Sequence, residues 1–463
     1  MFDKNFSQYS SNLCLISDEY TVNYQELDVI CSKIEAVLPE EKQLILLKAK
    51  VNIETIVGYL SFLRKNHTVI MFDGSIDDDL IQNIIESYTP NFIWETINSK
   101  NNYEVTYKTY GLRLVNPKRL NLHPELSLML STSGTTGSPK MVKLTKENLY
   151  VNAESIVQYL HIDESHRAIT NLPLYYSYGL SILNSHLEQG ASLVITDESI
   201  ISKEFWSTFK RYNVTTLSGV PYHYEILRRI GFLKMNLPSL KYMTQAGGKL
   251  NHKLVKEYAI WAKEKAIDFC VMYGQTEATA RISYLPIEKT LEKDDSIGIA
   301  IPNGTLKIKD LKTNQIINKV NVEGELIYEG KNVMMGYATC LSDLVKGDEL
   351  KGILHTGDLA QQDDDGYLYI TGRLKRFIKI HGNRIGLDEI EQYLKSLQFD
   401  VLCTGIENKL MIASKDEDKV ERIKQEVLEK YGFHHSIVKV KHVNEYPVSD
   451  TGKIQYKQLI GQF

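Results

Sequence analysis

The sequence lacks the features that define several large classes of protein. Its 463 residues include five cysteines, an odd number with no CxxC pair, so we expect neither a disulfide framework nor a cysteine metal site. No apolar segment of the signal-peptide kind follows the N-terminus, and no apolar run is long enough to span a bilayer. These absences predict a cytoplasmic protein without membrane insertion, with cysteines that serve as small buried apolar side chains.

An excess of charge of one sign is also missing. The 54 Lys and Arg residues nearly balance the 58 Asp and Glu residues, which leaves a net charge of -4. The field of the whole chain therefore predicts no nucleic-acid partner and no anionic membrane surface. The apolar and charged fractions are ordinary for a globular protein, and a chain of this length needs more than one hydrophobic core. We expect two or three domains.

The order of apolar and polar runs predicts an α/β fold. Strand-like runs at 44–47 and 68–72 flank a helical pattern at 53–63, and a similar rhythm resumes from 148 to 218. Such alternation is typical of a mainly parallel sheet. Beyond Pro286 the pattern changes to short strands with polar turns, which favours a small antiparallel sheet or barrel. The C-terminal residues carry their own pattern of helices and strands and predict a separate small module.

A loop rich in hydroxyl groups and glycine lies between two predicted strands at 126–130 and 141–144. Its residues are Ser131, Thr132, Ser133, Gly134, Thr135, Thr136, Gly137, Ser138, Pro139 and Lys140. This loop offers what a polyphosphate needs: backbone N–H groups that can approach it closely, hydroxyl donors and one cation. The glycine spacing differs from a Walker A loop. A plain polar turn is the alternative, and Thr145 is the predicted N-cap of the helix that follows.

Two further stretches follow predicted strands. In Ala246-Gly247-Gly248-Lys249, paired glycines allow a flat ring to lie against the backbone, although a simple strand-to-helix turn has the same composition. In Tyr273-Gly274-Gln275-Thr276-Glu277, the tyrosine can stack, the threonine can donate to phosphate and the glutamate can hold Mg²⁺. The alternative for Glu277 is a carboxylate at a helix N-terminus.

Three stretches nearer the C-terminus have weaker individual signals. His355-Thr356-Gly357-Asp358 places a carboxylate at a strand end, where it can accept ribose hydroxyls or cap a turn. The segment 372–379 carries four cations and crosses the boundary between the region of short strands and the C-terminal module. Such charges can also serve only to keep the surface soluble. Pro447 to Ile454 includes Gly452-Lys453, in a terminal region where chains are often poorly ordered.

Taken together, these six stretches resemble the adenylate-forming superfamily, which comprises acyl-CoA synthetases, acyl and aryl acid ligases and peptide-synthetase adenylation domains. The match runs from about Thr21 to Lys453. The resemblance implies an enzyme that joins a carboxylate to ATP, releases pyrophosphate and then transfers the acyl group to a thiol. Because two anions must approach each other, positioning and charge neutralisation should dominate the catalysis.

The resemblance also implies roles for individual residues. The loop from Ser131 to Lys140 would hold the β- and γ-phosphates, Thr276 would contact the α-phosphate and Glu277 would hold Mg²⁺. Lys453 resembles the adenylation lysine that bridges the carboxylate and the α-phosphate. The other residues that we expect to frame adenine and ribose are Gly247, Gly248, Lys249, Tyr273, Gly274, Gln275, Asp358 and Arg373.

The fold implied by the resemblance has two βα sheets plus a small distorted β-barrel in an N-terminal domain, and a mobile α+β C-terminal lid. We expect the N-terminal domain at 1–372, a hinge at 373–376 and the lid at 377–463. Lys375 falls on the hinge position. Lys379 matches the lysine that serves the thiol-transfer orientation. The lid would rotate between the two half-reactions.

The expected acid pocket includes Tyr176, Gly179, Ser218 and Gly219. Tyr176 occupies the gate position, where His or Phe is more usual. Gly179 stands where the amino-acid-activating branch has an aspartate for the α-ammonium group. Because a buried ammonium without a partner is costly, the sequence favours a simple, hydroxy- or aryl carboxylic acid. A shifted register, or an acidic residue elsewhere such as Glu225, would reverse that preference.

The thiol acceptor stays open between two partners. Arg376, Lys379 and Arg384 suit the phosphates of CoA, which we favour, but also an acidic carrier protein with phosphopantetheine. A nucleotide-binding protein without turnover is a rival class, which the combination of Lys453, Glu277 and Asp358 disfavours. A P-loop kinase would need a Walker lysine that the sequence lacks. Neither the acid nor the oligomeric state follows from the sequence.

Overall fold

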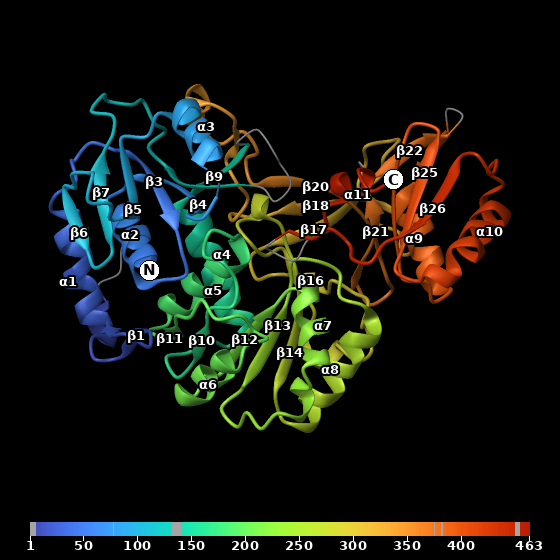
Figure 1. The fold of residues 1–463 in the computed structure, drawn as a ribbon, viewed down its shortest axis with the longest axis horizontal. Helices are drawn as coiled ribbons and strands as arrows, with labels where there is room; N and C mark the ends of the chain where they lie inside the picture. Colours follow the sequence, from blue (N-terminus) through green and yellow to red (C-terminus); the bar gives the residue numbers. More distant parts are fainter. Residues whose placement is uncertain (1–5, 77, 132–139, 375, 381–382, 450–453) are drawn as a thin grey trace. The chain divides into compact units, whose positions relative to one another are not determined.

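The chain folds into two compact units (Figure 1). The computed structural model describes residues 6–76, 78–131, 140–374, 376–380, 383–449 and 454–463, except for the side chains of Ser7, Asn383 and Arg384. The first unit consists of Met1–Thr305 and Tyr328–Leu354, and the second of Leu306–Ile327 and His355–Phe463. The expected α/β fold with large and small parts is confirmed. The predicted hinge at 373–376 describes a motion and stays a prediction.

An eight-stranded sheet forms one half of the first unit, in the order β19-β9-β8-β4-β3-β5-β7-β6. The inner strands β4, β3, β5 and β8 are parallel, as the βα rhythm predicts. The strands of this sheet are β3 (Leu44–Ala49), β4 (Thr68–Asp73), β5 (Phe92–Thr96), β6 (Val105–Tyr107), β7 (Tyr110–Leu114), β8 (Leu126–Ser131), β9 (Met141–Thr145) and β19 (Gly336–Ala338). Its sequence also contains the helices α1 (Tyr24–Glu35), α2 (Ile53–Arg64) and α3 (Asp78–Tyr88).

A nine-stranded sheet forms the other half, in the order β16-β15-β14-β13-β12-β10-β11-β1-β2. Its strands are β1 (Leu13–Ile16), β2 (Thr21–Asn23), β10 (Arg167–Ile169), β11 (Ser192–Val194), β12 (Thr216–Gly219), β13 (Tyr242–Gln245), β14 (Asp268–Tyr273), β15 (Ser283–Tyr284) and β16 (Ile299–Ala300). The associated helices are α4 (Lys146–Leu160), α5 (Ser177–Glu188), α6 (Lys203–Arg211), α7 (Pro221–Arg229) and α8 (His252–Glu264). Strands β10 to β14 are parallel.

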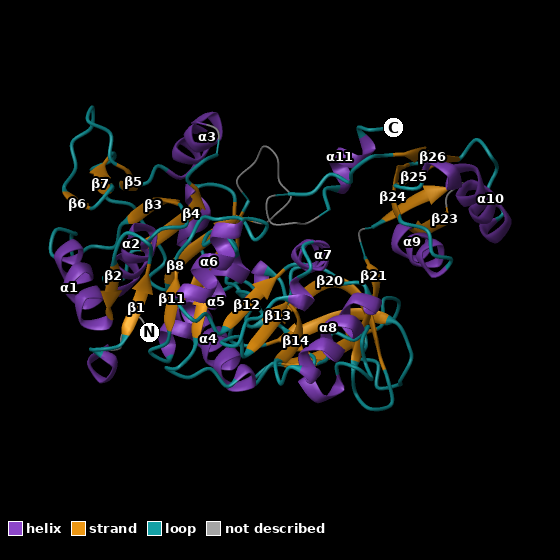
Figure 2. Ribbon diagram, turned by 60° about the horizontal axis from the view of Figure 1, so that its bottom comes forward, coloured by secondary structure: helices purple, strands orange, loops and turns teal. Residues whose placement is uncertain are grey.

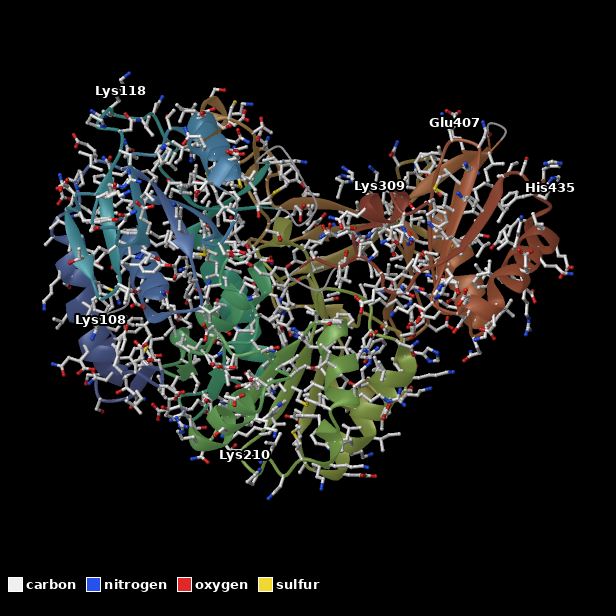
Figure 3. All side chains as sticks on the ribbon, viewed as in Figure 1. Lys108, Lys118, Lys210, Lys309, Glu407 and His435 are labelled. Atoms are coloured by element: carbon white, nitrogen blue, oxygen red, sulfur yellow. The ribbon has the colours of Figure 1, made fainter. Side chains whose placement is uncertain are left out.

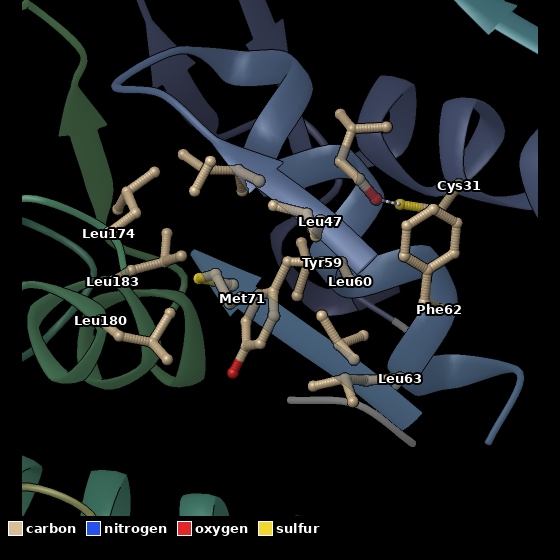
Figure 4. Packing of buried hydrophobic residues seen from close by; sticks show 14 of the residues in the cluster. Cys31, Leu47, Tyr59, Leu60, Phe62, Leu63, Met71, Leu174, Leu180 and Leu183 are labelled. Carbon is tan, nitrogen blue, oxygen red and sulfur yellow. Dashed lines mark hydrogen bonds between the residues drawn. The ribbon is translucent and has the colours of Figure 1, made fainter. Parts of the chain in front are cut away.

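Helix α5 is buried on all sides and shapes the interior of the first unit. Its leucines, among them Leu180 and Leu183, pack into a core with Met71 and Tyr59 of the eight-stranded-sheet half (Figure 4). Burial of one such leucine contributes about 1.5–3 kcal/mol. The serines Ser181 and Ser185 of the same helix line a hollow beside the nine-stranded sheet. One helix therefore supplies both a core stripe and the polar wall of a cavity.

Local signals in the sequence set where the helices begin. Thr145 is the N-cap of α4, as predicted: its side chain accepts from the Asn148 N–H at 3.0 Å, and the Asn148 side chain accepts from the Thr145 N–H. Asn23, Asn52 and Ser202 likewise accept from N–H groups in the first turns of α1, α2 and α6, and the reciprocal bond is also present at α1. Each such cap contributes about 1 kcal/mol. The short 3₁₀ turns are η1 (Phe6–Tyr9), η2 (Phe232–Lys234), η3 (Thr276–Ala278), η4 (Ile287–Lys289), η5 (Leu341–Val345) and η6 (Glu417–Lys419).

The second unit combines a small β region with a C-terminal α+β module (Figure 2). Most of a four-stranded sheet belongs to it, formed by β17 (Thr305–Lys309), β18 (Gly324–Glu329), β20 (Ile353–Gln362) and β21 (Leu368–Arg373). The module contains β22 (Phe377–Ile380), β23 (Asn383–Gly386), β24 (Val401–Ile406), β25 (Lys409–Ser414), β26 (Val438–His442), α9 (Leu387–Ser396), α10 (Val420–Tyr431) and α11 (Tyr456–Ile460). Its core includes Ile390, Ile412 and Ile423. It therefore buries apolar side chains of its own, as the sequence predicts.

Charged side chains cover the surfaces of both units (Figure 3). Lys118 and Lys210, for example, are exposed at the surface. In the part of the chain that the structure describes, no helix combines the length and the apolar character that a bilayer span requires.

Candidate active site

The predicted phosphate loop begins and ends on a β-hairpin of the first unit. Ser131 closes β8 and pairs with Met141 of β9, so the chain leaves one strand and returns in the next. Lys140 lies directly before β9. The loop residues Thr132, Ser133, Gly134, Thr135, Thr136 and Gly137 lie outside the described residues. Their assignment to the phosphates stays a prediction.

Tyr337 connects the lysine of this loop to the predicted magnesium ligand. It lies in β19, which pairs with β9, and the Lys140 ammonium is 3.4 Å from the centre of its ring. Its hydroxyl donates to Oε1 of Glu277 at 2.8 Å. Burial, and then the charge of Glu277, raise the pKa of Tyr337, so this phenol stays protonated and keeps donating. Two motifs that are far apart in the sequence thus meet at one side chain.

The segment from Tyr273 to Arg281 makes a tight turn that presents Glu277. Gly274 is required there because a Cβ would lie 1.8 Å from the Ala280 carbonyl oxygen. Thr279 has φ +65° and ψ -55°, and the Ala280 N–H donates to the Ala278 carbonyl at 2.6 Å, which describes a γ-turn of the strained, positive-φ type. Non-glycine residues held in such a conformation concentrate at functional sites.

Asn332 holds this strained turn in place. It is buried, and its amide donates to the carbonyl oxygens of Ala278 and Arg281 at 2.9 and 2.8 Å. Its own side-chain oxygen accepts from the Tyr328 hydroxyl at 2.7 Å, and its backbone carbonyl accepts from the Thr279 hydroxyl at 2.7 Å. The conformation of the Glu277 loop is therefore set by hydrogen bonds from a segment that follows it by more than fifty residues.

Thr276 lies at the beginning of α5. Its hydroxyl is 3.2 Å from the hydroxyl of Ser177, the first residue of that helix, and both side chains are buried. The N-cap residue Tyr176 makes no side-chain hydrogen bond to the first N–H groups of α5. The positive end of a helix and two hydroxyl groups therefore face the same place, an arrangement that favours an anion.

The paired glycines meet the predicted gate residue. Gly247 has φ +83°, and a Cβ there would lie 2.5 Å from the Tyr176 hydroxyl. Burial raises the pKa of Tyr176 to about 12, so its phenol is neutral. Gly248 is exposed, and Lys249 forms an ion pair with Asp295 at 2.8 Å. Gln275 donates to the Tyr273 hydroxyl at 3.1 Å. The adenine-framing roles of these residues stay predictions.

The second unit contains the expected ribose-binding pair. Asp358 of β20 faces Arg373 of β21 in the strand register, and the Arg373 Nε lies 2.9 Å from the Asp358 carboxylate. Asp358 is buried, whereas Arg373 is exposed. Lys379 is exposed on β22. The predicted hinge residue Lys375 and the predicted adenylation residue Lys453 lie outside the described residues.

A small cavity in the first unit contains one of the expected substrate-pocket residues, Ser218. It lies between α4, α5 and the strands β12 to β14, and the space in it that is open to a water molecule is about 10 Å³, room for about one water. Gly219 follows Ser218 in β12, and Gly179 in α5 packs so tightly that a Cβ would lie 2.2 Å from the Pro173 carbonyl oxygen. The lining residues are Ile156, Leu160, Ile162, Ser181, Ile182, Ser185, His186, Ser218, Tyr242, Thr244, Met272 and Arg281. None of them is acidic, and Glu225 is exposed on α7.

The residues around Glu277 fit a magnesium ion that is held by a single protein carboxylate. Among the described residues, no three His, Cys, Asp or Glu side chains gather as a metal-binding cluster. Mg²⁺ is nevertheless commonly held by one or two carboxylates together with substrate phosphates and water, and not by a cage of protein ligands. A single carboxylate, held by Tyr337 and lying near the phosphate-loop lysine, agrees with that mode of binding.

Sequence reasoning missed three residues that the structure places in this region. Tyr337 and Asn332 act on the Glu277 loop from a segment without a motif. Arg281 lies four residues after Glu277 and lines the cavity. The sequence signal for Arg281 is a lone cation four residues after Glu277.

Comparisons with known proteins identify the family to which the chain belongs. The family model described as AMP-binding enzyme matches residues 2–338, well over half of the chain. A 4-coumarate–CoA ligase-like protein of Arabidopsis thaliana is 28% identical over 375 residues, which are 77% of this chain and 65% of the relative. A D-alanine–D-alanyl carrier protein ligase of Bacillus cytotoxicus is 22% identical over 486 residues, which are 95% of this chain and 94% of the relative.

A solved structure has the same fold along nearly the whole chain. It is the o-succinylbenzoate CoA synthetase of Bacillus subtilis in complex with its acyl-adenylate intermediate, with a TM-score of 0.77 and 20% sequence identity. The likeness covers 98% of this chain and 97% of that one. The resemblance drawn from the sequence motifs is thus confirmed, and the chain belongs to the AMP-binding enzyme family.

Proposed function

We propose that this enzyme is an ATP-dependent acid–thiol ligase. In the first half-reaction, a carboxylate oxygen attacks the α-phosphorus of ATP, the bond to the bridging oxygen breaks and pyrophosphate leaves. In the second, a thiolate attacks the acyl carbon and AMP leaves. The observation that carries the proposal is the connection of Lys140, Tyr337 and Glu277, because it links the phosphate-loop lysine to the magnesium ligand through a single side chain.

Each residue has a defined task in this scheme. The Ser131–Lys140 loop holds the β- and γ-phosphates, Thr276 donates to the α-phosphate and Asp358 accepts the ribose hydroxyls beside Arg373. Lys453 brings the two anions together, and Lys379 serves thiol transfer. Magnesium, when bound by Glu277, would neutralise phosphate charge and orient the leaving group. Asn332 and Tyr337 keep the Glu277 carboxylate in position.

We propose CoA as the thiol and a non-amino carboxylic acid as the substrate. The relatives support either a CoA or a carrier-protein acceptor, because their names include a CoA ligase-like protein and a carrier protein ligase. The cavity supports the second part of the proposal: its lining offers no carboxylate to an α-ammonium group. We also propose a cytoplasmic location, since none of the five cysteines forms a disulfide and four are buried.

The first test is acid-dependent ATP–pyrophosphate exchange, measured with pools of short, aryl, fatty and amino acids without thiol. Exchange with a non-amino pool is expected. Exchange with amino acids alone would overturn the substrate proposal. The absence of exchange with every pool would overturn the proposed activity. Addition of CoA should then increase AMP release, and an increase only with a phosphopantetheinylated carrier protein would establish the alternative acceptor.

A pair of lysine variants tests the division of the two half-reactions. Lys453→Ala should lose about a hundredfold or more in adenylation, the scale of one transition-state donor, and still transfer the acyl group from supplied acyl-AMP. Lys379→Ala should show the reverse pattern. Equal loss of both half-reactions in both variants would contradict the proposed rotation of the lid.

A further inference from the structure

We propose that Arg281 selects an acid substrate with a second anionic group, of which a dicarboxylic acid is the simplest example. The inference rests on the proposed function, because it assigns the small cavity beside Arg281 to the distant anionic group of the acid. The reacting carboxylate lies toward Thr276 and the nucleotide. The second anion pairs with Arg281 inside the cavity, so that Arg281 determines specificity.

Arg281 is buried without a carboxylate partner among the residues that the structure describes. The residue is 2% exposed, and the described residues contain no carboxylate within ion-pair distance of its guanidinium. Its Nε has no hydrogen-bond partner in this part of the chain, and one terminal nitrogen makes a long bond of 3.4 Å to the Ala280 carbonyl. The guanidinium lies over the ring of Tyr178, 4.1 Å from its centre.

The other polar groups of the cavity do not neutralise this charge. Arginine keeps its proton in proteins, so the guanidinium is a permanent cation. Burial lowers the pKa of His186 to about 4, and burial raises the pKa of Tyr242, so both are neutral near pH 7. Ser181, Ser185 and Ser218 contribute hydroxyl groups only. A buried cation without an anion is unfavourable, and a bound carboxylate would remove that cost.

The backbone holds Arg281 firmly in this position. Its carbonyl oxygen accepts from the amides of Asn332 at 2.8 Å and Asn152 at 3.4 Å. It also follows the strained turn at Thr279, so the same loop carries Glu277 and Arg281. The residue proposed to bind the second anion, Arg281, and the predicted magnesium ligand, Glu277, are therefore only four residues apart.

The size and polarity of the cavity narrow the substrate further. The space open to a water molecule is about 10 Å³, which is room for about one water, so the group that replaces this water beside Arg281 must be as small as a carboxylate. The hydroxyl groups of Ser218 and Thr244 are 2.8 Å apart, and the Tyr178 hydroxyl donates to the Thr244 backbone carbonyl at 2.9 Å. These groups can complete the hydrogen bonds of a carboxylate that already pairs with the guanidinium.

Two other roles for Arg281 make different predictions. If it only supports the fold by stacking on Tyr178, its removal will lower stability and leave acid preference unchanged. If it binds the reacting carboxylate, its removal will impair every acid equally. Only if Arg281 selects a second anion will the loss of activity depend on whether the distant end of the acid is charged.

The test compares acids that are matched in length by ATP–pyrophosphate exchange: succinate with butyrate, and glutarate with valerate. For the wild-type enzyme, kcat/KM for one of the diacids should exceed that for its matched monoacid at least tenfold. In Arg281→Met that diacid should lose about a hundredfold, the scale of a lost buried charge pair, while the monoacid is unchanged or improved. Arg281→Gln serves as a second variant if the first does not fold.

Arg167→Met is the matched control. Arg167 is a half-buried arginine of the same unit that donates to the Ser192 hydroxyl and the Tyr212 carbonyl, away from the cavity lining. It should leave the diacid preference unchanged. A wild-type preference for monoacids, or an equal loss with all acids in Arg281→Met, would overturn the inference. Exchange with no acid of any kind would instead overturn the proposed function.

Discussion

Two arginines of this protein each lie over a tyrosine ring, but only one of them is paired with carboxylates among the described residues. Arg281 in the first unit lies over the ring of Tyr178 at 4.1 Å, and Arg376 in the second unit lies over Tyr456 at 3.7 Å. Arg376 also donates to the Asp388 carboxylate, to Glu391 at 2.5 Å and to the Cys403 carbonyl at 2.7 Å. Among the described residues, Arg281 pairs with no carboxylate. One arginine completes the interior of its unit, and the other leaves a charge for a ligand.

This difference corrects one expectation about the thiol acceptor. The sequence grouped Arg376 with Lys379 as a basic surface for CoA or a carrier protein. The structure shows that the charge of Arg376 is neutralised internally, with its side chain 14% exposed. Lys379 remains exposed on β22. A run of cations along a sequence therefore overstates the charge that a partner can reach.

The largest expected effect breaks the paired site. Arg376→Met should destabilise the second unit by about 3–5 kcal/mol, because it leaves the partly buried Asp388 carboxylate without a cation and the buried Glu391 carboxylate with Lys395 alone. Hydrogen exchange of peptides from 387–414 should show the loss of protection. All three tryptophans belong to the first unit, so the urea transition followed by tryptophan fluorescence should change little.

Arg422 provides the control for this comparison. It is 71% exposed and lies 3.9 Å from Glu426, so Arg422→Met should cost less than about 0.5 kcal/mol. If Arg376→Met were as mild as Arg422→Met, the carboxylates of the second unit would not depend on their arginine. The contrast between the two buried sites would then have no energetic basis.

Acid should weaken the two units in different pH ranges. Burial lowers the pKa of His67 and of His186, both in the first unit, to about 4. The unfolded chain takes up these protons near pH 6.5, so stability is full above that pH and falls between pH 6.5 and 4. Each histidine contributes about 1.4 kcal/mol per pH unit in this range.

The second unit should lose stability only at a lower pH than the first unit. Burial raises the pKa of Glu391, but Arg376 and Lys395 outweigh it and hold this pKa below the usual 4.5. Its contribution is therefore present above pH 4.5 and is lost only as the pH falls through the folded-state value. Tryptophan-detected urea unfolding at pH 7, 6 and 5 tests the first unit. His67→Asn, which can still accept from the Gln43 N–H, should flatten part of the slope. An unchanged transition across this range would contradict the prediction.

The fold was largely predictable, because its signals are local. The βα rhythm, the cap at Thr145 and the helices of the C-terminal module follow from periodicity and capping chemistry. The motifs identified the stretch around Glu277 for the same reason. The grouping of 306–327 with the C-terminal residues did not follow, because compactness depends on contacts between segments that are distant in the sequence.

The partners of the site residues were less predictable. Nothing near Tyr337 or Asn332 in the sequence indicates that they hold the Glu277 loop, since strand pairing and the fold bring them there. Likewise, the sequence shows a positive charge at both Arg281 and Arg376. It does not show which of them meets a carboxylate, because Asp388 and Glu391 reach Arg376 only through the packing of α9.

A smaller effect should follow from removal of the Tyr337 hydroxyl. Tyr337→Phe keeps the ring beneath Lys140 but removes the bond to Glu277, which is worth about 1.5–3 kcal/mol for a charged acceptor. The Mg²⁺ concentration for half-maximal exchange should rise, and kcat should fall about tenfold. Tyr369→Phe is the control, because its hydroxyl donates to Asp363 in a turn of the second unit. An unchanged magnesium dependence would remove Tyr337 from the site.

The smallest effect should distinguish the two arginines by conservative replacement. At Arg376, lysine cannot reproduce the fork that reaches Asp388, Glu391 and the Cys403 carbonyl, so Arg376→Lys should still destabilise the second unit.

At Arg281 a point charge is enough to attract an anion. Arg281→Lys should therefore keep the preference for the diacid while its kcat/KM falls about tenfold, or about 1.4 kcal/mol. The measurement is the ratio of kcat/KM for each diacid to its matched monoacid in the exchange assay. A ratio near one in Arg281→Lys would show that the geometry of the guanidinium, and not its charge, selects the acid.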